Sequence, residues 1–118
     1  MRVLFIDDEQ DFLTLMQSRL EKRGFTIFTA PSGTEALAVM DKEPLDAVVL
    51  DMKMAGMDGI EVLREIKNRQ PDLPVLILSG HASPDVAMTS IESGAVDYLL
   101  KPAPLNVLID RLRDMVRS

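Results

Sequence analysis

At the centre of the chain the sequence reads Ala47-Val48-Val49-Leu50-Asp51, four apolar residues in a row followed by a carboxylate. An unbroken apolar run of this length is typical of a parallel strand that is covered on both faces. Two other runs have the same character, Val3-Leu4-Phe5-Ile6 and Val75-Leu76-Ile77-Leu78. The run Thr26-Ile27-Phe28-Thr29 is more polar and predicts a strand nearer the sheet edge, and Tyr98-Leu99-Leu100 predicts a short last strand.

Amphipathic segments separate these strands, and their apolar residues recur at the spacing of one helix face. Ser32 is the predicted N-cap of the second helix, with Glu35 placed for a capping box. Gly24 and Gly94 stand where the first and fourth helices should end. Strands that alternate with helices predict an α/β fold with a parallel sheet and right-handed crossovers. The apolar residues that mark the five helices are, in chain order, Phe12, Leu13, Met16 and Leu20; Ala36, Leu37 and Met40; Ile60, Leu63 and Ile66; Val86 and Ile91; and Leu105, Leu108, Ile109, Leu112, Met115 and Val116.

The bulk composition narrows the classes of function. The length of 118 residues fits one compact domain, which we expect to span residues 1–118. The chain has no cysteine and one histidine, which argues against disulfides, thiol nucleophiles and Cys- or His-rich metal sites. The formal net charge of -6 disfavours binding of nucleic acid by this domain. No apolar run approaches the roughly 20 residues that span a bilayer, and no signal peptide is visible, so no membrane partner is expected.

Polar residues follow the predicted strands at their carboxyl ends, where open parallel sheets bind ligands. Each of them has a structural explanation, since aspartate caps helices and forms turns, and Asp8 or Glu9 suits the start of the first helix. Their joint occurrence favours a functional site. In chain order they are Asp7, Asp8 and Glu9 after the first strand, Asp51 after the third, Ser79 after the fourth and Lys101 after the fifth.

Three carboxylates at one sheet edge repel one another, since two unit charges about 4 Å apart cost on the order of 4 kcal/mol at an effective dielectric of 20. Such a cluster needs a cation, and a ligand set made only of oxygens indicates Mg²⁺. Lys101 supplies a second positive charge. A dication, a lysine and a hydroxyl around one carboxylate are what in-line transfer of a phosphoryl group requires, with the aspartate as covalent acceptor.

Over essentially its whole length the sequence resembles the response-regulator receiver domain of two-component signalling. The resemblance implies a flavodoxin-like sheet with strand order 2-1-3-4-5. It also implies a switch, not an enzyme acting on other molecules, which takes a phosphoryl group on Asp51 and catalyses only its own phosphorylation and dephosphorylation. The motifs that carry the resemblance are Phe5-Ile6-Asp7-Asp8-Glu9, Asp51-Met52-Lys53-Met54 leading into Gly56-Met57-Asp58-Gly59, Leu78-Ser79-Gly80-His81, and Gly94-Ala95 through Tyr98 to Lys101-Pro102.

The resemblance implies a metal site. Asp8 and Asp51 would bind Mg²⁺, or Mn²⁺, directly, and Asp7 would bind it directly or through a water molecule. The backbone carbonyl of Lys53 would complete the ligands from the protein. The side chains of Lys53 and His81 would tune the lifetime of the phosphorylated state, or would equally be solvated loop side chains.

The resemblance also implies roles around the phosphoryl group. Lys101 would bind a phosphoryl oxygen and, before phosphorylation, would pair with Asp51. Ser79 would hydrogen-bond the phosphoryl group, and Tyr98 would be the aromatic residue that switches. The Lys101-Pro102 peptide bond would be cis, which is inexpensive only before proline.

Other classes match the sequence less well. A haloacid-dehalogenase-type phosphatase places Asp-x-Asp after the first strand, a flavodoxin needs a hydroxyl-rich phosphate loop there, and a P-loop enzyme needs Gly-Lys-Ser/Thr. The remaining alternative is a degenerate, receiver-like adaptor that acts as a protein-interaction module without phosphorylation. It would lack at least one of Asp8, Asp51 and Lys101, and all three are present.

The expected partner is a sensor histidine kinase or a phosphotransfer protein, and the expected location is the cytoplasm. Around Tyr98, the charges of Glu92, Asp97, Arg111 and Arg113 suit either a weak homodimer with two-fold symmetry or ordinary solubilisation, and we favour the second. The sequence fits a stand-alone regulator and one domain of a longer protein equally well.

Overall fold

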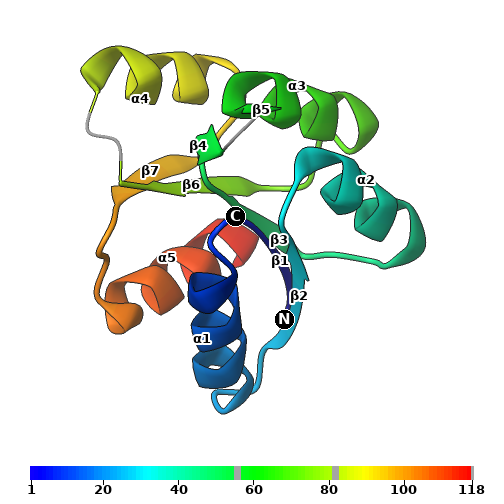
Figure 1. The fold of residues 1–118 in the computed structure, drawn as a ribbon, viewed down its shortest axis with the longest axis vertical. Helices are drawn as coiled ribbons and strands as arrows, with labels where there is room; N and C mark the ends of the chain where they lie inside the picture. Colours follow the sequence, from blue (N-terminus) through cyan, green and yellow to red (C-terminus); the bar gives the residue numbers. More distant parts are fainter. Residues whose placement is uncertain (55–56, 81–82, 118) are drawn as a thin grey trace.

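A computed structural model describes residues 1–54, 57–80 and 83–117 and has the α/β architecture that the sequence predicts (Figure 1). Five parallel strands form one sheet in the order β2-β1-β3-β6-β7. The strands are β1 Arg2–Ile6, β2 Thr26–Ala30, β3 Ala47–Leu50, β6 Val75–Ser79 and β7 Asp97–Leu100. Because β6 and β7 are the fourth and fifth strands of this sheet, the predicted order 2-1-3-4-5 is confirmed.

The backbone ladder of the sheet continues past the strand ends into the residues of interest. The amide of Asp7 donates to the carbonyl of Ala30 at 3.1 Å, and the amide of Asp51 donates to Ile6 at 2.9 Å. The amide of Lys101 donates to Ser79 at 2.9 Å. Backbone hydrogen bonds of the sheet therefore fix the positions of Asp7, Asp51 and Lys101 independently of their side-chain contacts.

A short hairpin that the sequence did not predict follows β3. Its strands are β4 Lys53–Met54 and β5 Met57–Asp58, which pair antiparallel and form a separate two-stranded sheet. The paired segments are only two residues long, which is too short to leave a periodic pattern in the sequence. The hairpin connects the Asp51 edge of the main sheet to the helix that follows.

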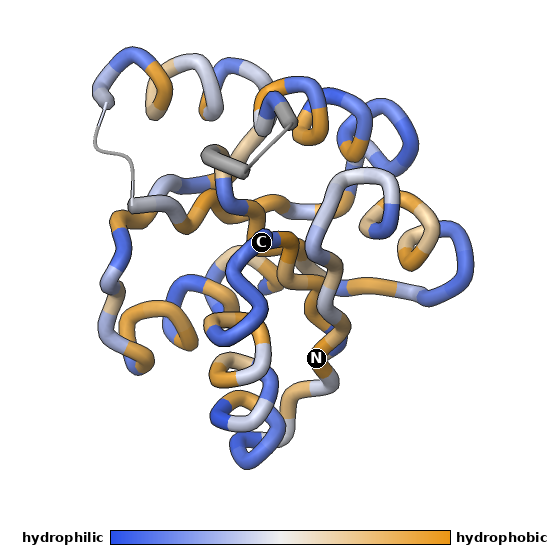
Figure 2. Tube along the Cα trace, in the orientation of Figure 1, coloured by the Kyte–Doolittle hydropathy of each residue, from blue (hydrophilic) through white to orange (hydrophobic). Residues whose placement is uncertain are grey.

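Five helices in the described residues cover the two faces of the sheet (Figure 1). The helices α1 Gln10–Glu21 and α5 Leu105–Arg117 lie on one face, and α2 Gly33–Lys42, α3 Gly59–Arg69 and α4 Pro84–Glu92 lie on the other. Each face buries its own cluster of apolar side chains, and the apolar strands lie between the two helical layers (Figure 2). None of the helices in these residues combines the length and the apolar character that crossing a membrane requires.

Local signals at the helix ends act as the sequence predicts, with one exception. Ser32 Oγ accepts a hydrogen bond from the amide of Glu35 at 3.2 Å, so the predicted N-cap of α2 is confirmed. Gly24 and Gly94, after α1 and α4, have φ angles of +88° and +112°, a region that favours glycine. At α1, Glu9 occupies the N-cap position, but its side chain makes no capping hydrogen bond.

Two of the predicted helix-face residues are exposed rather than buried. Ile91 in α4 is 46% exposed and Val116 in α5 is 36% exposed. The helix α4 lies over the β7 end of the sheet, and Ser90 is its only fully buried residue, so Ile91 turns to the surface. Val116 lies in the last turn of α5, beyond the residues that pack on the sheet.

Substitutions at buried and at exposed apolar positions of α5 should differ sharply in their effect on stability. Leu112 is fully buried, so Leu112→Ala should lower the free energy of unfolding by about 2–5 kcal/mol through lost burial and a residual cavity. The matched control Val116→Ala, on the same helix, should change it by less than about 0.5 kcal/mol. Urea denaturation of both variants checks this, and similar losses for both would contradict the packing described here.

Candidate functional site

Three carboxylates converge at the carboxyl edge of the sheet. Asp7 follows β1 and Asp51 follows β3, and their residues are only 2% and 4% exposed. Asp8, beside Asp7, is exposed. One carboxylate oxygen from each of the three residues lies within 4.8 Å of the others. The structure thus brings together the three acids that the sequence analysis singled out.

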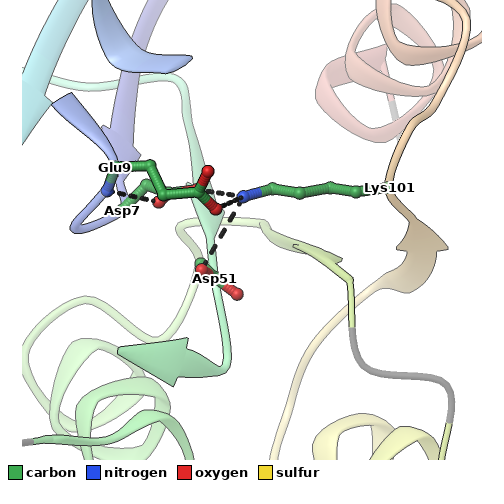
Figure 3. A network of polar contacts seen from close by, with 4 residues as sticks. All are labelled: Asp7, Glu9, Asp51 and Lys101. Atoms are coloured by element: carbon green, nitrogen blue, oxygen red, sulfur yellow. Dashed lines mark hydrogen bonds and ion pairs between the residues drawn. The ribbon is translucent and has the colours of Figure 1, made fainter. Parts of the chain in front are cut away.

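The side chain of Lys101 extends toward this cluster from the side opposite Asp7 and Glu9, with its ammonium next to the carboxylates (Figure 3). Its Nζ lies 2.5 Å from Asp7 Oδ2, 3.3 Å from Glu9 Oε1 and 3.7 Å from Asp51 Oδ2. The family resemblance implies a pair between Lys101 and Asp51, and the two groups do lie within ion-pair distance. The shorter contact, however, is with Asp7, which also accepts the backbone amide of Glu9 at 2.9 Å.

Burial and charge act against each other at this ion pair. Burial raises the pKa of Asp7 above its usual 3.8, and the hydrogen bond from Lys101 does not cancel the effect. Burial would lower the pKa of Lys101, but the hydrogen bond to Asp7 and the charges of Asp7 and Asp51 outweigh it and raise that pKa above 10.5. The two directions are compatible because the Asp7 side chain is more buried than that of Lys101. Three carboxylates, of Asp7, Asp8 and Asp51, meet at the site where Lys101 supplies one ammonium, so the formal charges of the cluster do not cancel.

The acids fit a divalent cation with oxygen ligands. Mg²⁺ binds oxygens at roughly 2.1 Å, so oxygens that share the ion lie within about 4.2 Å of one another, close to the spacing found here. Asp8 is exposed, which leaves one side of the cluster open to the water molecules that Mg²⁺ retains. The backbone of Lys53 lies in β4, two residues after Asp51. Asp7, Asp8 and Asp51 are the side chains that would hold the ion, and the Lys53 carbonyl stays a predicted ligand.

Two hydroxyl groups come from the strands β6 and β7, on the side of β3 away from β1. Ser79, the last residue of β6, is completely buried, and its side chain is hydrogen-bonded to the Tyr98 hydroxyl. Burial raises the pKa of Tyr98, the hydrogen bond with Ser79 lowers it, and the charge of Asp51 raises it further. The Tyr98 ring is half-buried and packs against the core cluster under α2, α3 and α4. The Lys101–Pro102 peptide bond is cis.

A close contact that the sequence analysis did not identify fixes the segment after Asp51. A Cβ placed on Gly59 would lie 2.7 Å from Met52 Cα and 2.8 Å from the Met52 carbonyl oxygen. The start of α3 therefore packs directly on the backbone of the residue after Asp51, and only glycine permits this approach. The motif that contains Gly59 was recognised in the sequence, but its steric reason was not.

Lys101 has further neighbours that the sequence pattern did not predict. Its Nζ lies 4.3 Å from the centroid of the Phe12 ring, and Glu9 contacts the same ammonium. Phe12 was interpreted only as an apolar residue of the first helix. Its position five residues after Asp7 was the available signal, but it gives no distance to a residue near the other end of the chain. His81, a predicted tuning residue, lies outside the described residues.

Comparisons with known proteins agree with this fold and site. A family model described as response regulator receiver domain matches residues 3–113. The transcriptional regulatory protein ZraR of Klebsiella oxytoca is 40% identical over 106 residues, which are 90% of this chain and 24% of that protein. PrrA of Mycobacterium tuberculosis is 38% identical over 116 residues, 98% of this chain and 50% of that protein. The chain therefore spans between a quarter and a half of the length of these relatives.

Solved structures give the same result. The receiver domain protein from Clostridium thermocellum is 36% identical with a TM-score of 0.91, covering 98% of this chain and 94% of that one. The BeF3-activated N-terminal receiver domain of Klebsiella pneumoniae RstA is 32% identical with a TM-score of 0.92, covering all of both chains. The doubly wound sheet with an acidic cluster and a lysine at its carboxyl edge therefore belongs to a chain of the receiver class. The chain belongs to the response regulator receiver domain family.

The raised pKa of Asp7 predicts a pH dependence of stability in the metal-free protein. A carboxyl whose pKa is higher in the folded state binds more protons there, so its contribution to stability falls as the pH rises from 3.8 through the folded pKa. The variant Asp7→Asn removes this pH-dependent contribution to the free energy of unfolding. The free energy of unfolding of the variant relative to wild type should therefore increase with pH over that window and then level off. Urea titrations in EDTA between pH 4 and 8 check this, and a difference that declines with pH would contradict it.

Proposed function

We propose that this domain is a phosphorylation-dependent switch that accepts a phosphoryl group on Asp51 in the presence of Mg²⁺. The observation that carries the proposal is the environment of Asp51, a buried carboxylate with two further carboxylates on one side and the Lys101 ammonium 3.7 Å away. A buried nucleophile beside a dication site and a lysine ammonium is suited to phosphoryl transfer, which depends mainly on positioning and charge neutralisation.

In the transfer step an Asp51 carboxylate oxygen forms a bond to the phosphorus of the donor. With a phosphohistidine donor the P–N bond breaks, and its electron pair leaves with the imidazole nitrogen. With acetyl phosphate the P–O bond breaks and acetate leaves. A bound Mg²⁺ would neutralise phosphoryl charge and orient its oxygens. Lys101 moves from Asp7 toward a phosphoryl oxygen, over a short path because its ammonium already lies between Asp7 and Asp51.

The proposal predicts stoichiometric, metal-dependent modification of Asp51. Acetyl phosphate or phosphoramidate with Mg²⁺ or Mn²⁺ should add one phosphoryl group to the intact protein, and EDTA should abolish the addition. Asp51→Asn should lose it, because the amide is not a nucleophile. The matched control Asp58→Asn changes a nearby acid that caps α3 and should retain the modification, since asparagine also caps helices. Intact-protein mass spectrometry provides the readout, and unchanged yield in Asp51→Asn would refute the assignment.

We further propose that Ser79 and Tyr98 carry the signal to the α4–β7–α5 face. A serine hydroxyl has one proton and two lone pairs. Ser79 is thus able to give its proton to a phosphoryl oxygen in a charge-assisted hydrogen bond while accepting the proton of Tyr98. A groove of about 320 Å³ beside Tyr98, lined by Ser83, Pro84, Ala87 and Leu100, gives the ring and the start of α4 room to rearrange.

The face around Tyr98 contains charges as well as apolar side chains. Arg111 forms an ion pair with Asp97 within the same chain, so these two charges are already satisfied without a second copy. This supports the interpretation that they solubilise the surface. Leu100, exposed and lining the groove beside Tyr98, is suited to contact a partner that recognises the phosphorylated form, and Met88 is a second exposed apolar residue on α4.

Amide exchange tests the proposed route from Ser79. Adding beryllofluoride and Mg²⁺, which mimic the phosphoryl group, should change exchange along residues 83–98 as well as around Asp51. Ser79→Ala should confine the change to the neighbourhood of Asp51, because the link to Tyr98 is lost. Ser93→Ala, at the end of α4, should behave like wild type. A wild-type response that never reaches residues 83–98 would refute the route.

Receiver domains of response regulators are signalling switches rather than classical enzymes, and response regulators receive signals from histidine kinases. We propose such a kinase, or a phosphotransfer protein, as the phosphoryl donor for this chain. The cytoplasmic location expected from the sequence stays a prediction. The degenerate adaptor is disfavoured because the residues that it would lack are present and Asp8, Asp51 and Lys101 lie at one site.

A further inference from the structure

The aromatic ring of Phe12 contacts the ammonium of Lys101 at the site. The Lys101 ammonium has carboxylates of Asp7, Glu9 and Asp51 within 4 Å. The face of the Phe12 ring lies 4.3 Å from the same nitrogen, measured to the ring centroid. This is well within the roughly 6 Å over which a ring attracts a cation. The ring and the carboxylates thus enclose the ammonium together.

Packing alone does not require an aromatic residue at this position. Phe12 is half-buried, in the first turn of α1, and its ring packs only at the margin of the cluster formed by α1 and α5. The deep positions of that cluster on α1 are Leu13, Met16 and Leu20. An aliphatic side chain would cover the same margin, whereas only an aromatic ring also attracts a cation.

We propose that Phe12 is a positioning residue that holds the Lys101 ammonium at the site while leaving it free to move between oxygen partners. This inference rests on the phosphoryl transfer proposed above. Lysine has a flexible four-carbon stem and is strongly hydrated, so an ammonium without support samples many positions in water. The ring covers part of the ammonium and limits these positions.

The chemical character of the ring explains why it suits this task better than a fourth carboxylate. A carboxylate oxygen binds the ammonium in a directed hydrogen bond and competes with the phosphoryl group for it. The attraction of a ring face is weaker and tolerates lateral movement of the cation. Lys101 therefore shifts from Asp7 to a phosphoryl oxygen on Asp51 without losing its contact with Phe12.

The contact itself is measurable before any phosphorylation. A ring face this close shields the neighbouring methylene, so the ε-CH₂ protons of Lys101 should appear upfield of those of other lysines in NMR spectra of the metal-free protein. The shift should vanish in Phe12→Leu and persist in Phe12→Tyr. Phe28→Leu is the matched control, because it removes a ring that lies over Arg2 rather than Lys101. It should leave the Lys101 signal unchanged.

The effect on transfer is tested with the same variants, acetyl phosphate and Mg²⁺. Phe12→Leu should slow phosphorylation of Asp51 by up to about fivefold, because without the ring the ammonium spends less time at the site, and a cation–π contact of ordinary strength supports a population change of that size. Phe12→Tyr and Phe28→Leu should stay near the wild-type rate. Mg²⁺ affinity should be the same within about twofold in all of them, because Phe12 acts on the ammonium and contributes no ligand. A ring that only held the start of α1 in place would disturb Asp7 and Asp8, so Mg²⁺ affinity and rate would fall together.

Each outcome decides a separate point. An unshifted Lys101 signal in wild type, a wild-type rate in Phe12→Leu, or a parallel loss of Mg²⁺ affinity would overturn the role of Phe12. If wild-type protein accepts no phosphoryl group, the proposed function fails, and with it the transfer role of Phe12. The upfield shift still decides whether the ring holds the ammonium.

Discussion

The repulsion between carboxylates at the carboxyl edge of the sheet is the constraint on which the site depends. Asp7 and Asp51 are buried where water does little to separate their charges, and Asp8 adds a third charge at the rim. In the metal-free protein a single ammonium opposes this repulsion. Burial, with a smaller contribution from the charge of Asp51, raises the pKa of Asp7, and the contact with Lys101 does not cancel that effect. The fold therefore maintains a site that favours the arrival of positive charge. In the proposed phosphoryl transfer, a divalent cation bound by these carboxylates would supply that positive charge.

Much of this arrangement could be predicted from the sequence because parallel sheets convert chain order into spatial order. Unbroken apolar runs identify buried strands, and their carboxyl ends gather the residues that follow them. The convergence of Asp7, Asp51, Ser79 and Lys101 follows from that rule. The buried face of each helix is harder to predict from the sequence. The spacing of Ile91 and Val116 fits a helix, but it does not show how much of each helix the sheet covers, and both residues are exposed.

The details that escaped prediction are contacts between side chains from distant parts of the chain. Lys101 lies nearer to Asp7 than to Asp51, and this preference depends on distances of a few ångströms that no pattern encodes. The ring of Phe12 beside Lys101 and the approach of Gly59 to Met52 are of the same kind. The β4–β5 hairpin is local, but its two-residue strands are shorter than any period that a sequence reveals.

The backbone hydrogen bonds that continue past the strand ends fix the distance between the acidic residues of the site. Asp7 and Asp51 leave neighbouring strands, and the amide of Asp51 is held by the carbonyl of Ile6. Adjacent strands are about 4.8 Å apart in any sheet, so the separation of these two acids is inherited from backbone geometry rather than from loop sequence. Loops around the site are therefore free to diverge, altering access and partner choice, while the spacing between the acids stays constant.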